Sequence, residues 1–362
     1  MNVMKIRNFC LLLMALVAFA SCGSDEEDEL IGNWYSRGDF NGPARGYATS
    51  FVIGDNAYVC LGYNAKSKAM NDIWVYDAVK KTWDSLAMFP GVARYGASAF
   101  VVNSKAYVGL GTNGTECYKD FWEFDPTKGP IDPKTKNPKG EWTRVTEDFL
   151  GASRCLAVAE GLAGKGIVGT GVDAISQGSN LKDFFSFTPG STPGSGTWVE
   201  ISSYEGEKRQ AASTFVIGNY MYLVGGINNN RNPVDMQKYD PSSNKWEKVL
   251  DLRNTDLTSD DDKYGSIPRA NASTFVINGK GYITLGTIGS SQTYTTFEYD
   301  PSANKWIEVT AFSKAWRSNA VSFSLSETGK TRGFVLTGKS GDTRFDDFCE
   351  FYPNVENDTY DD

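Results

Sequence analysis

The chain of 362 residues contains no histidine, and this absence excludes several kinds of active site. Zinc sites built on three histidines, the Ser-His-Asp triad and the Cys-His pair all require an imidazole. Copper sites with histidine ligands are excluded for the same reason. Basic residues are also fewer than acidic ones, 36 against 44, so the net charge is −8. Because an acidic surface repels phosphate backbones, we expect no nucleic-acid partner.

Long apolar runs are missing as well. The apolar stretch from Cys10 to Ala20 is too short for a membrane-spanning helix, which needs about 20 residues. It follows Lys5 and Arg7, and this order is typical of a signal peptide. Residues 19–22, Phe-Ala-Ser-Cys, resemble the processing site of a bacterial lipoprotein. We therefore expect a lipoprotein signal peptide over residues 1–21 and lipidation at Cys22.

An acidic linker over residues 22–31 follows, with the sequence Ser-Asp-Glu-Glu-Asp-Glu at 24–29. This run resembles the segment that directs some Gram-negative lipoproteins to the outer surface. We therefore expect a monomer on the outer membrane of a Gram-negative bacterium, at the cell surface, that meets the membrane only through its lipid. A plain cleaved signal followed by a disordered linker is the alternative. Residues 354–362 form a second acidic segment at the C-terminus.

Cysteine is scarce once Cys10 and Cys22 are set aside. Four remain, namely Cys60, Cys117, Cys155 and Cys349. An exported protein can form disulfides, but no paired spacing predicts one here. Cys60, Cys155 and Cys349 fall within expected strands, where a buried free thiol is the expected state.

Residues 32–353 repeat one unit six times. Each copy starts at an arginine and continues with two apolar runs separated by a turn, which is a hairpin pattern. A variable loop, an aromatic third strand and a fourth strand opened by tryptophan complete the unit. The arginines are Arg45, Arg94, Arg154, Arg209, Arg269 and Arg317. The pattern predicts four antiparallel strands per repeat.

The sixth copy has no tryptophan at its end, but Trp34 precedes the first copy. The spacing from Trp34 to Arg45 equals the spacing from Trp83 to Arg94. We therefore expect the N-terminal strand to complete the last repeat and close a ring, which removes the exposed sheet edges. A closed ring of four-stranded sheets is a β-propeller.

This pattern resembles the kelch repeat family. Gly225-Gly226 is the family's glycine pair, and the other copies keep the second glycine at Gly62, Gly111, Gly171, Gly286 and Gly338. The Tyr-Asp ending of several third strands and the tryptophan that follows also match. The resemblance implies an all-β, six-bladed kelch propeller with four antiparallel strands per blade, closed by the N-terminal strand.

Several repeated positions have a structural interpretation. The alanine three residues after each arginine suits the narrow central channel, and the blade tryptophans and the row Phe51, Phe100, Phe215, Phe275 and Phe323 are expected core. Aspartates that end third strands, such as Asp77 and Asp125, suit turn capping. Glu160 replaces the phenylalanine of its row. A local shift of that degenerate repeat is the favoured explanation, and a functional carboxylate is the alternative.

The arginines should ring one mouth of the channel, on the end of the propeller that we call the arginine face. A second row, Asp72, Asp120, Asp183, Asp235, Thr295 and Asp347, starts the third strands on the same face. The favoured interpretation is a network of Arg–Asp pairs that ties the blades together. The alternative is that the arginines bind an anionic or polyhydroxyl ligand, which their planar fork suits. Ligand-binding candidates are the six arginines with Tyr47, Tyr95 and Trp316 beside them.

One insertion falls on this face, around Leu252–Ile267, with Asp256, Asp260, Asp261 and Asp262. It could form a lid or a recognition loop. Its acidic residues match no calcium-loop spacing, so we expect neither a metal nor another cofactor.

Two functions of different class remain open. The leading hypothesis is a non-catalytic module that binds a glycan or a protein partner on the arginine face. The alternative rests on a resemblance to N-acetylneuraminate epimerases, which are sugar mutarotases with a six-bladed kelch architecture; anomer exchange needs only acid, base and anion-holding groups. Galactose oxidase has a related propeller, but its copper ligands include histidines, which this chain lacks.

Overall fold

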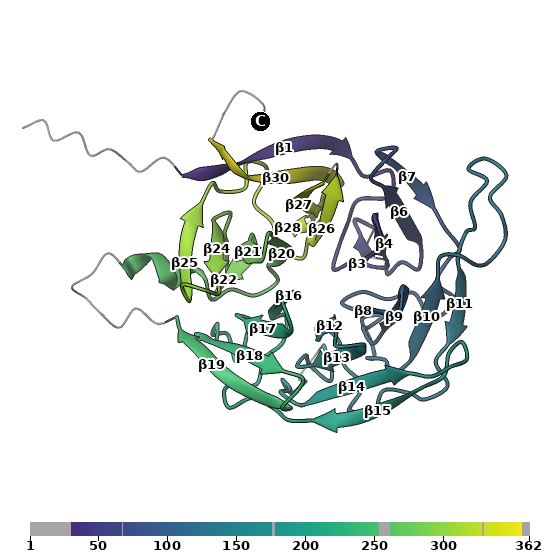
Figure 1. Ribbon diagram of the computed structural model, residues 1–362, viewed down its shortest axis with the longest axis horizontal. Coiled ribbons are helices and arrows are strands. Elements are labelled where there is room, and N and C mark those ends of the chain that lie inside the picture. Colours follow the sequence, from purple (N-terminus) through teal and green to yellow (C-terminus); the bar gives the residue numbers. More distant parts are fainter. Residues whose placement is uncertain (1–29, 67, 176–177, 253–260, 328, 357–362) are drawn as a thin grey trace, which may run out of the picture. The chain divides into compact units, whose positions relative to one another are not determined.

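The computed structural model describes residues 30–66, 68–175, 178–252, 261–327 and 329–356. Six four-stranded antiparallel sheets follow one another around a central channel, as Figure 1 shows for the propeller unit. The sequence-based expectation of a six-bladed all-β propeller is therefore confirmed. The predicted signal peptide and Cys22 lie outside the described residues. Within the described residues, no helix is both long and apolar enough to cross a membrane.

In blades 1 to 5 the strands run from the channel outward in chain order, and in blade 6 the N-terminal strand is the outermost. Blade 1 contains β3 (Thr49–Ile53), β4 (Asn56–Cys60), β6 (Ile73–Asp77) and β7 (Thr82–Ser85). Blade 2 contains β8 (Ser98–Val102), β9 (Lys105–Gly109), β10 (Phe121–Asp125) and β11 (Glu141–Arg144). Blade 3 contains β12 (Val158–Leu162), β13 (Lys165–Gly169), β14 (Phe184–Pro189) and β15 (Gly196–Ile201).

The second half of the ring repeats this order. Blade 4 contains β16 (Ser213–Ile217), β17 (Tyr220–Val224), β18 (Asp235–Asp240) and β19 (Lys245–Asp251). Blade 5 contains β20 (Ser273–Ile277), β21 (Lys280–Thr284), β24 (Thr296–Asp300) and β25 (Lys305–Val309). Blade 6 contains β26 (Val321–Glu327), β27 (Lys330–Leu336), β30 (Asp347–Glu356) and, as its outer strand, β1 (Ile31–Asp39).

Short elements decorate the loops of the arginine face. Three two-stranded ladders pair β2 (Arg45–Gly46) with β5 (Tyr63–Asn64), β22 (Thr287–Ile288) with β23 (Ser291–Gln292), and β28 (Lys339–Ser340) with β29 (Thr343–Arg344). A 3₁₀ turn, η1, spans Asp261–Ser266.

The ring closes between the two ends of the described chain. Strand β1 pairs antiparallel with β30, and Trp34 lies opposite Phe351. The other five blade tryptophans each lie opposite an aromatic residue of the third strand in the same way, for example Trp83 opposite Tyr76. Trp34 thus takes the blade position that the sixth repeat lacks, as its spacing predicts, and it is 1% exposed. Figure 1 shows the purple β1 alongside the yellow β30 at the rim.

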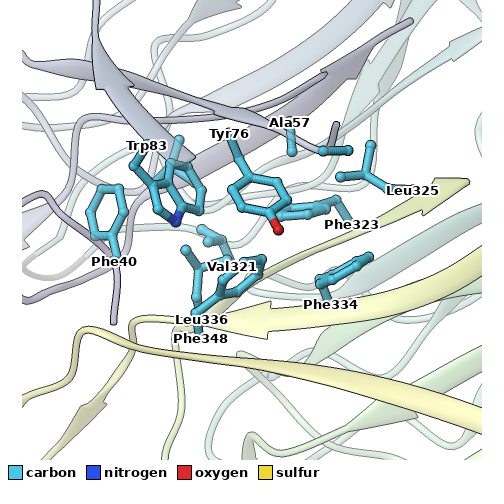
Figure 2. Close-up of a cluster of buried hydrophobic side chains, with 12 residues drawn as sticks. Phe40, Ala57, Tyr76, Trp83, Val321, Phe323, Leu325, Phe334, Leu336 and Phe348 are labelled. Atoms are coloured by element: carbon cyan, nitrogen blue, oxygen red, sulfur yellow. The ribbon is translucent and has the colours of Figure 1, made fainter. Parts of the chain in front are cut away.

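Aromatic side chains fill the seams between blades. Figure 2 shows the seam between blades 6 and 1, where Phe323 and Phe334 lie near Tyr76 and Trp83. Phenylalanines of the predicted row stack on an aromatic residue of the second strand, as Phe51 does on Tyr58 with ring centroids 4.9 Å apart. Burying one such aromatic side chain contributes about 2 kcal/mol, so the repeated seams make a large contribution to the stability of the propeller.

Blade 3 breaks the phenylalanine row without a shift in register. Glu160 lies opposite Ile167, and Val158 opposite Gly169, as Phe100 and Ser98 lie opposite Tyr107 and Gly109 in blade 2. The favoured explanation of a local shift is therefore wrong. In other blades the phenylalanine side chain packs on a small residue of the next blade. For example, a Cβ at Gly281 would lie 2.6 Å from Phe215. In blade 4 the position equivalent to Gly281 is the fully buried Met221, so a phenylalanine at position 160 would have less room than its counterparts.

Candidate ligand-binding face

The six repeat arginines are buried side chains, each at most 1% exposed. In Arg94, Nη1 donates to Oδ1 of Asp120 at 2.6 Å and Nη2 donates to Oδ2 at 3.0 Å. Nη1 also donates to the carbonyl of Leu110, and Nε donates to that of Val92. The guanidinium therefore has both charge compensation and acceptors, which a buried cation requires.

The same arrangement recurs around the ring with one exception. The carboxylate partners are Asp72 for Arg45, Asp183 for Arg154, Asp235 for Arg209 and Asp347 for Arg317. Arg269 instead donates to the hydroxyl and carbonyl oxygens of Thr295. Burial without a carboxylate lowers the pKa of the Arg269 guanidinium to about 9. The predicted Arg–Asp network is thus present, and its one gap coincides with the one threonine of the row.

The inter-blade connection comes from the arginine main chain, because each side-chain pair lies within a single blade. The carbonyl of Arg94 accepts a hydrogen bond from the amide of Gly62 in blade 1, at 3.0 Å. The corresponding glycine of every other blade does the same toward the next arginine. This corrects the expectation that the Arg–Asp pairs themselves join the blades.

The second kelch glycine is required at these connections. Gly111 has a φ of +86°, and a Cβ there would lie 2.9 Å from the carbonyl oxygen of Tyr95. The left-handed conformation directs its amide to the carbonyl of Arg154, at 2.9 Å. Any L-residue would be strained and crowded at this position.

A closed circle of main-chain hydrogen bonds surrounds the channel mouth on the arginine face. The amide of Tyr47 donates to the carbonyl of Asn319, and the amide of Gly96 donates to that of Tyr47. The circle continues in the same sense through the residue two places after each remaining arginine: Leu156, Ala211, Asn271 and back to Asn319. All six members have a φ between +51° and +59°. Such strain in non-glycine residues persists only where the surroundings enforce it, so the mouth has a fixed geometry.

The channel behind this circle holds one ionisable residue. The cavity has a volume of about 520 Å³ and is lined by the first strands of all blades, and Glu160 is the only carboxylate among the described residues that line it. The hydroxyl of Thr214 donates to Oε1 of Glu160 at 2.8 Å. Burial raises the pKa of Glu160 to about 7, and the Thr214 hydrogen bond opposes that rise.

Tyrosines and cations cover the outer surface of the arginine face over blades 6, 1 and 2. The Tyr95 ring packs between those of Tyr47 and Tyr63, with centroid distances of 5.6 and 5.0 Å. The Arg344 guanidinium lies 5.7 Å from the Tyr63 centroid, and the Lys339 ammonium lies 5.9 Å from that of Tyr47. Among the described residues, no ion pair uses either cation, and Nε of Arg344 is a buried donor without an acceptor.

A second aromatic pair lies on the loops of the same face, at the boundary of blades 5 and 6. Trp316 and Tyr294 stack with ring centroids 4.3 Å apart and an interplanar angle of 15°. They are 52% and 38% exposed, respectively. Gln292 Nε2 donates to the carbonyl of Lys339, so the Tyr294 loop is tied to blade 6. We call the set of Tyr47, Tyr63, Tyr95, Tyr294, Trp316, Lys339 and Arg344 the aromatic surface.

The structure thus separates two groups of predicted site residues. Tyr47, Tyr95 and Trp316 belong to the aromatic surface, whereas the six arginines lie inside the blades with their donors engaged. A ligand-binding role for the arginine side chains stays a prediction. Tyr63, Tyr294, Lys339 and Arg344 were missed, because they occupy variable loops and no repeated position marks them.

The predicted insertion near Leu252–Ile267 is described only in part. Asp256 and Asp260 lie outside the described residues, and a lid or recognition role for the segment stays a prediction. Leu252 and Ile267 at its two ends are fully buried, and the carbonyl of Ser266 in η1 accepts from Nε of Arg269 at 2.9 Å. Within the described part of the chain, no group of three or more Asp, Glu or Cys residues is arranged to hold a metal ion.

A family model described as Kelch motif matches residues 44–87 and 208–252, which lie in blades 1 and 4. Six closed four-stranded blades surround these two matched segments. The chain is a six-bladed β-propeller that carries kelch motifs. The hydrogen bonds described above give the structural role of the repeated arginine and of the second glycine.

Two groups of known proteins resemble this kelch propeller. The N-acetylneuraminate epimerase of Shigella boydii serotype 4 (strain Sb227) is 34% identical over 95 residues, and that of Escherichia coli (strain K12) is 33% identical over 95 residues. Each match covers 25% of this chain and only 22% of the relative. The solved structure titled "Structure of YjhT" aligns with a TM-score of 0.66 at 16% identity, over 86% of this chain and 95% of that one. That likeness shows a shared fold.

Proposed function

We propose that this kelch propeller is a lipid-anchored, exported binding module that holds a glycan or protein partner on its arginine face without catalysis. The observation that carries the proposal is the exposed stacked pair of Trp316 and Tyr294 in the aromatic surface. Aromatic rings with one apolar face and one polar edge suit ligands that present both kinds of surface, and sugars do so.

The charges of the surface favour a ligand with an anionic group. Arg344 and Lys339 flank Tyr63 and Tyr47, and Nε of Arg344 is a buried donor without an acceptor among the described residues. A carboxylate of a ligand that stacked on these rings would meet two cations that no described carboxylate neutralises. The arginines of the repeat support the surface by fixing the loops that carry it.

Export and anchoring complete the proposal. The basic start, the apolar run to Ala20 and Cys22 support a lipoprotein signal, and the acidic linker supports delivery to the outer surface. Membrane fractionation of cells that express the whole chain, with mass spectrometry of the N-terminal peptide, tests this part. We expect a lipidated Cys22, and Cys22→Ser should release the protein from the membrane fraction. An unmodified Cys22 in a membrane-free protein would contradict it.

A sugar mutarotase is the second candidate, and two observations favour it. The first is the 34% identity to N-acetylneuraminate epimerases over 95 residues. The second is Glu160, whose raised pKa of about 7 suits a group that both donates and accepts a proton near neutral pH. An acidic sugar beside Glu160 would need an arginine to hold its anionic group. The repeat arginines do not supply it, because each is buried inside its blade.

A glycan-array screen combined with NMR of sialic acid anomer exchange separates the candidates. The binding-module proposal predicts a glycan hit that weakens in Trp316→Ala and no change in the anomer exchange rate. A faster exchange that is lost in Glu160→Gln would favour the mutarotase and contradict the non-catalytic proposal. The absence of both signals would remove the sugar ligands and leave a protein partner.

A further inference from the structure

Two cysteines from neighbouring blades lie in contact. The Sγ atoms of Cys117 and Cys155 are 3.3 Å apart, although the residues are separated by 38 positions in sequence. Cys117 belongs to the loop between β9 and β10 of blade 2, and Cys155 follows Arg154 at the entrance to blade 3. Cys155 therefore precedes β12 and does not lie within a regular strand, contrary to the sequence-based expectation.

Main-chain pairing holds both residues in place. Cys155 and Val172 exchange two hydrogen bonds of 3.0 Å, and Cys117 forms an isolated bridge with Thr112. The Thr112 hydroxyl donates to the carbonyl of Glu116 at 2.7 Å, which fixes the loop just before Cys117. Because a disulfide has an S–S distance of about 2.05 Å, the two sulfurs need to approach by only about 1 Å to bond.

The two thiols differ in access. Cys117 is half-buried beside the exposed residues 113–116, whereas Cys155 is fully buried. The hydrogen bond between the thiols lowers the pKa of Cys117, against the effect of burial. The same contact raises the pKa of Cys155, and burial adds to that rise. Cys117 is thus the thiol that an external reagent can reach as a thiolate, and thiolates are the attacking species in exchange.

We propose that Cys117 and Cys155 form a disulfide across the seam of blades 2 and 3, by exchange with a disulfide-bearing oxidant. The Cys117 thiolate attacks one sulfur of the oxidant, forms a mixed disulfide and releases the first thiol. Cys155 then loses its proton and attacks Sγ of Cys117, which releases the second thiol. The chain loses two electrons and two protons, and the oxidant is reduced to two thiols.

The disulfide would join two points that already hold the ring together. Cys155 is bonded to Arg154, whose side chain pairs with Asp183 and whose carbonyl accepts from Gly111 of blade 2. A bond from Cys117 to Cys155 would hold the same seam covalently and close a long chain loop, which restricts the unfolded state. Cys60 and Cys349 lie buried in β4 and β30, and we expect both to remain thiols.

Equilibration of the whole chain in buffers of reduced and oxidised glutathione tests this inference. After acid quenching and alkylation, peptide mapping should show a cross-linked peptide joining Cys117 to Cys155 in oxidising buffer, while Cys60 and Cys349 stay alkylated. Alkylation of both Cys117 and Cys155 throughout, or glutathione retained on Cys117 with Cys155 still a thiol, would overturn the proposal.

Thermal unfolding gives a second measurement that does not depend on mapping. The oxidised chain should unfold about 5 °C above the reduced chain. In Cys117→Ser, a small change at a half-buried position, the difference between the two buffers should vanish. An equal difference in Cys117→Ser and the unmodified chain would show that the stabilisation has another source and would contradict the proposal.

Discussion

Arg94 and Asp120 form a two-point ion pair inside blade 2, with Nη1 to Oδ1 at 2.6 Å and Nη2 to Oδ2 at 3.0 Å. The main-chain carbonyl of Arg94 accepts from Gly62 of blade 1. Through its side chain Arg94 connects the loops that enter and leave the inner strands of blade 2. Through its carbonyl it attaches blade 2 to blade 1. The main-chain link recurs in every blade and the ion pair in every blade except blade 5, so the first role of the arginine row is to hold the propeller together.

Asp120→Asn should destabilise the propeller by about 3 kcal/mol, because it leaves the buried Arg94 guanidinium without a countercharge. The matched control is Asp148→Asn. Asp148 pairs with Arg144 at 2.6 Å, but both side chains are about half exposed, so its loss should cost less than about 1 kcal/mol. Urea denaturation of the two variants measures the difference. Equal small losses would contradict a structural role for the buried pair.

The same pair should make stability fall in acid. Burial acts to raise the pKa of Asp120, but the hydrogen bonds and charge of Arg94 outweigh it and hold that pKa below its usual value. The stabilisation is therefore complete above the ordinary carboxyl pKa of about 4 and disappears as the pH falls through the lower value of the folded state. The stability difference between the unmodified chain and Asp120→Asn should shrink from pH 5 to pH 2. A difference that is constant over this range would argue against ionic pairing.

Thr295→Asp should stabilise blade 5, because it supplies the carboxylate that Arg269 alone lacks. Nη2 of Arg269 donates to the Thr295 hydroxyl at 2.9 Å, so an aspartate there would lie within reach of the guanidinium. The expected gain is about 1–2 kcal/mol over Thr295→Asn, which has the same size without the charge. Denaturant unfolding at pH 7 measures it, and equal stability of the two variants would count against an uncompensated charge at Arg269.

Glu160→Gln should stabilise the chain at alkaline but not at acidic pH. Because burial raises the pKa of Glu160 to about 7, the unfolded chain releases this proton at lower pH than the folded one, and stability falls as the pH rises from about 4.5 to 7. The variant should match the unmodified chain near pH 4.5 and exceed it by about 2 kcal/mol at pH 8. Glu200→Gln, which removes the same charge from the exposed outer strand of the same blade, is the control, and an equal effect of the two variants would contradict a special role of burial at Glu160.

The regular part of the fold could be predicted from the sequence because each blade presents the same residues at the same steps. Trp34 illustrates this: its spacing to Arg45 assigned it to the last blade, and its register opposite Phe351 confirms that position. The pairing of arginines and aspartates was also foreseeable, since their side chains start strands on one face. The main-chain hydrogen bonds that join the blades could not be predicted, because any residue type can form a backbone hydrogen bond.

Exceptions to the repeat were harder to interpret. Glu160 fits a shift in register on sequence alone, because the sequence does not show that the larger Met221 takes the position of a small residue in the next blade. Tyr294 and Arg344 lie in loops of variable length, where no periodicity places a side chain. The contact of Cys117 with Cys155 could not be predicted either, because it depends on how two such loops meet between blades 2 and 3.

Affinity of the aromatic surface for a glycan found by array screening is the most direct test of the central claim. Trp316→Ala should weaken binding of that glycan at least tenfold by calorimetry, because it removes the exposed half of a stacked pair. Tyr220→Ala is the matched control, since Tyr220 is 39% exposed at the start of β17, on the opposite face from the arginines. It should leave the affinity unchanged. Equal affinity of the unmodified chain, Trp316→Ala and Tyr220→Ala would contradict the assignment of the arginine face as the binding face.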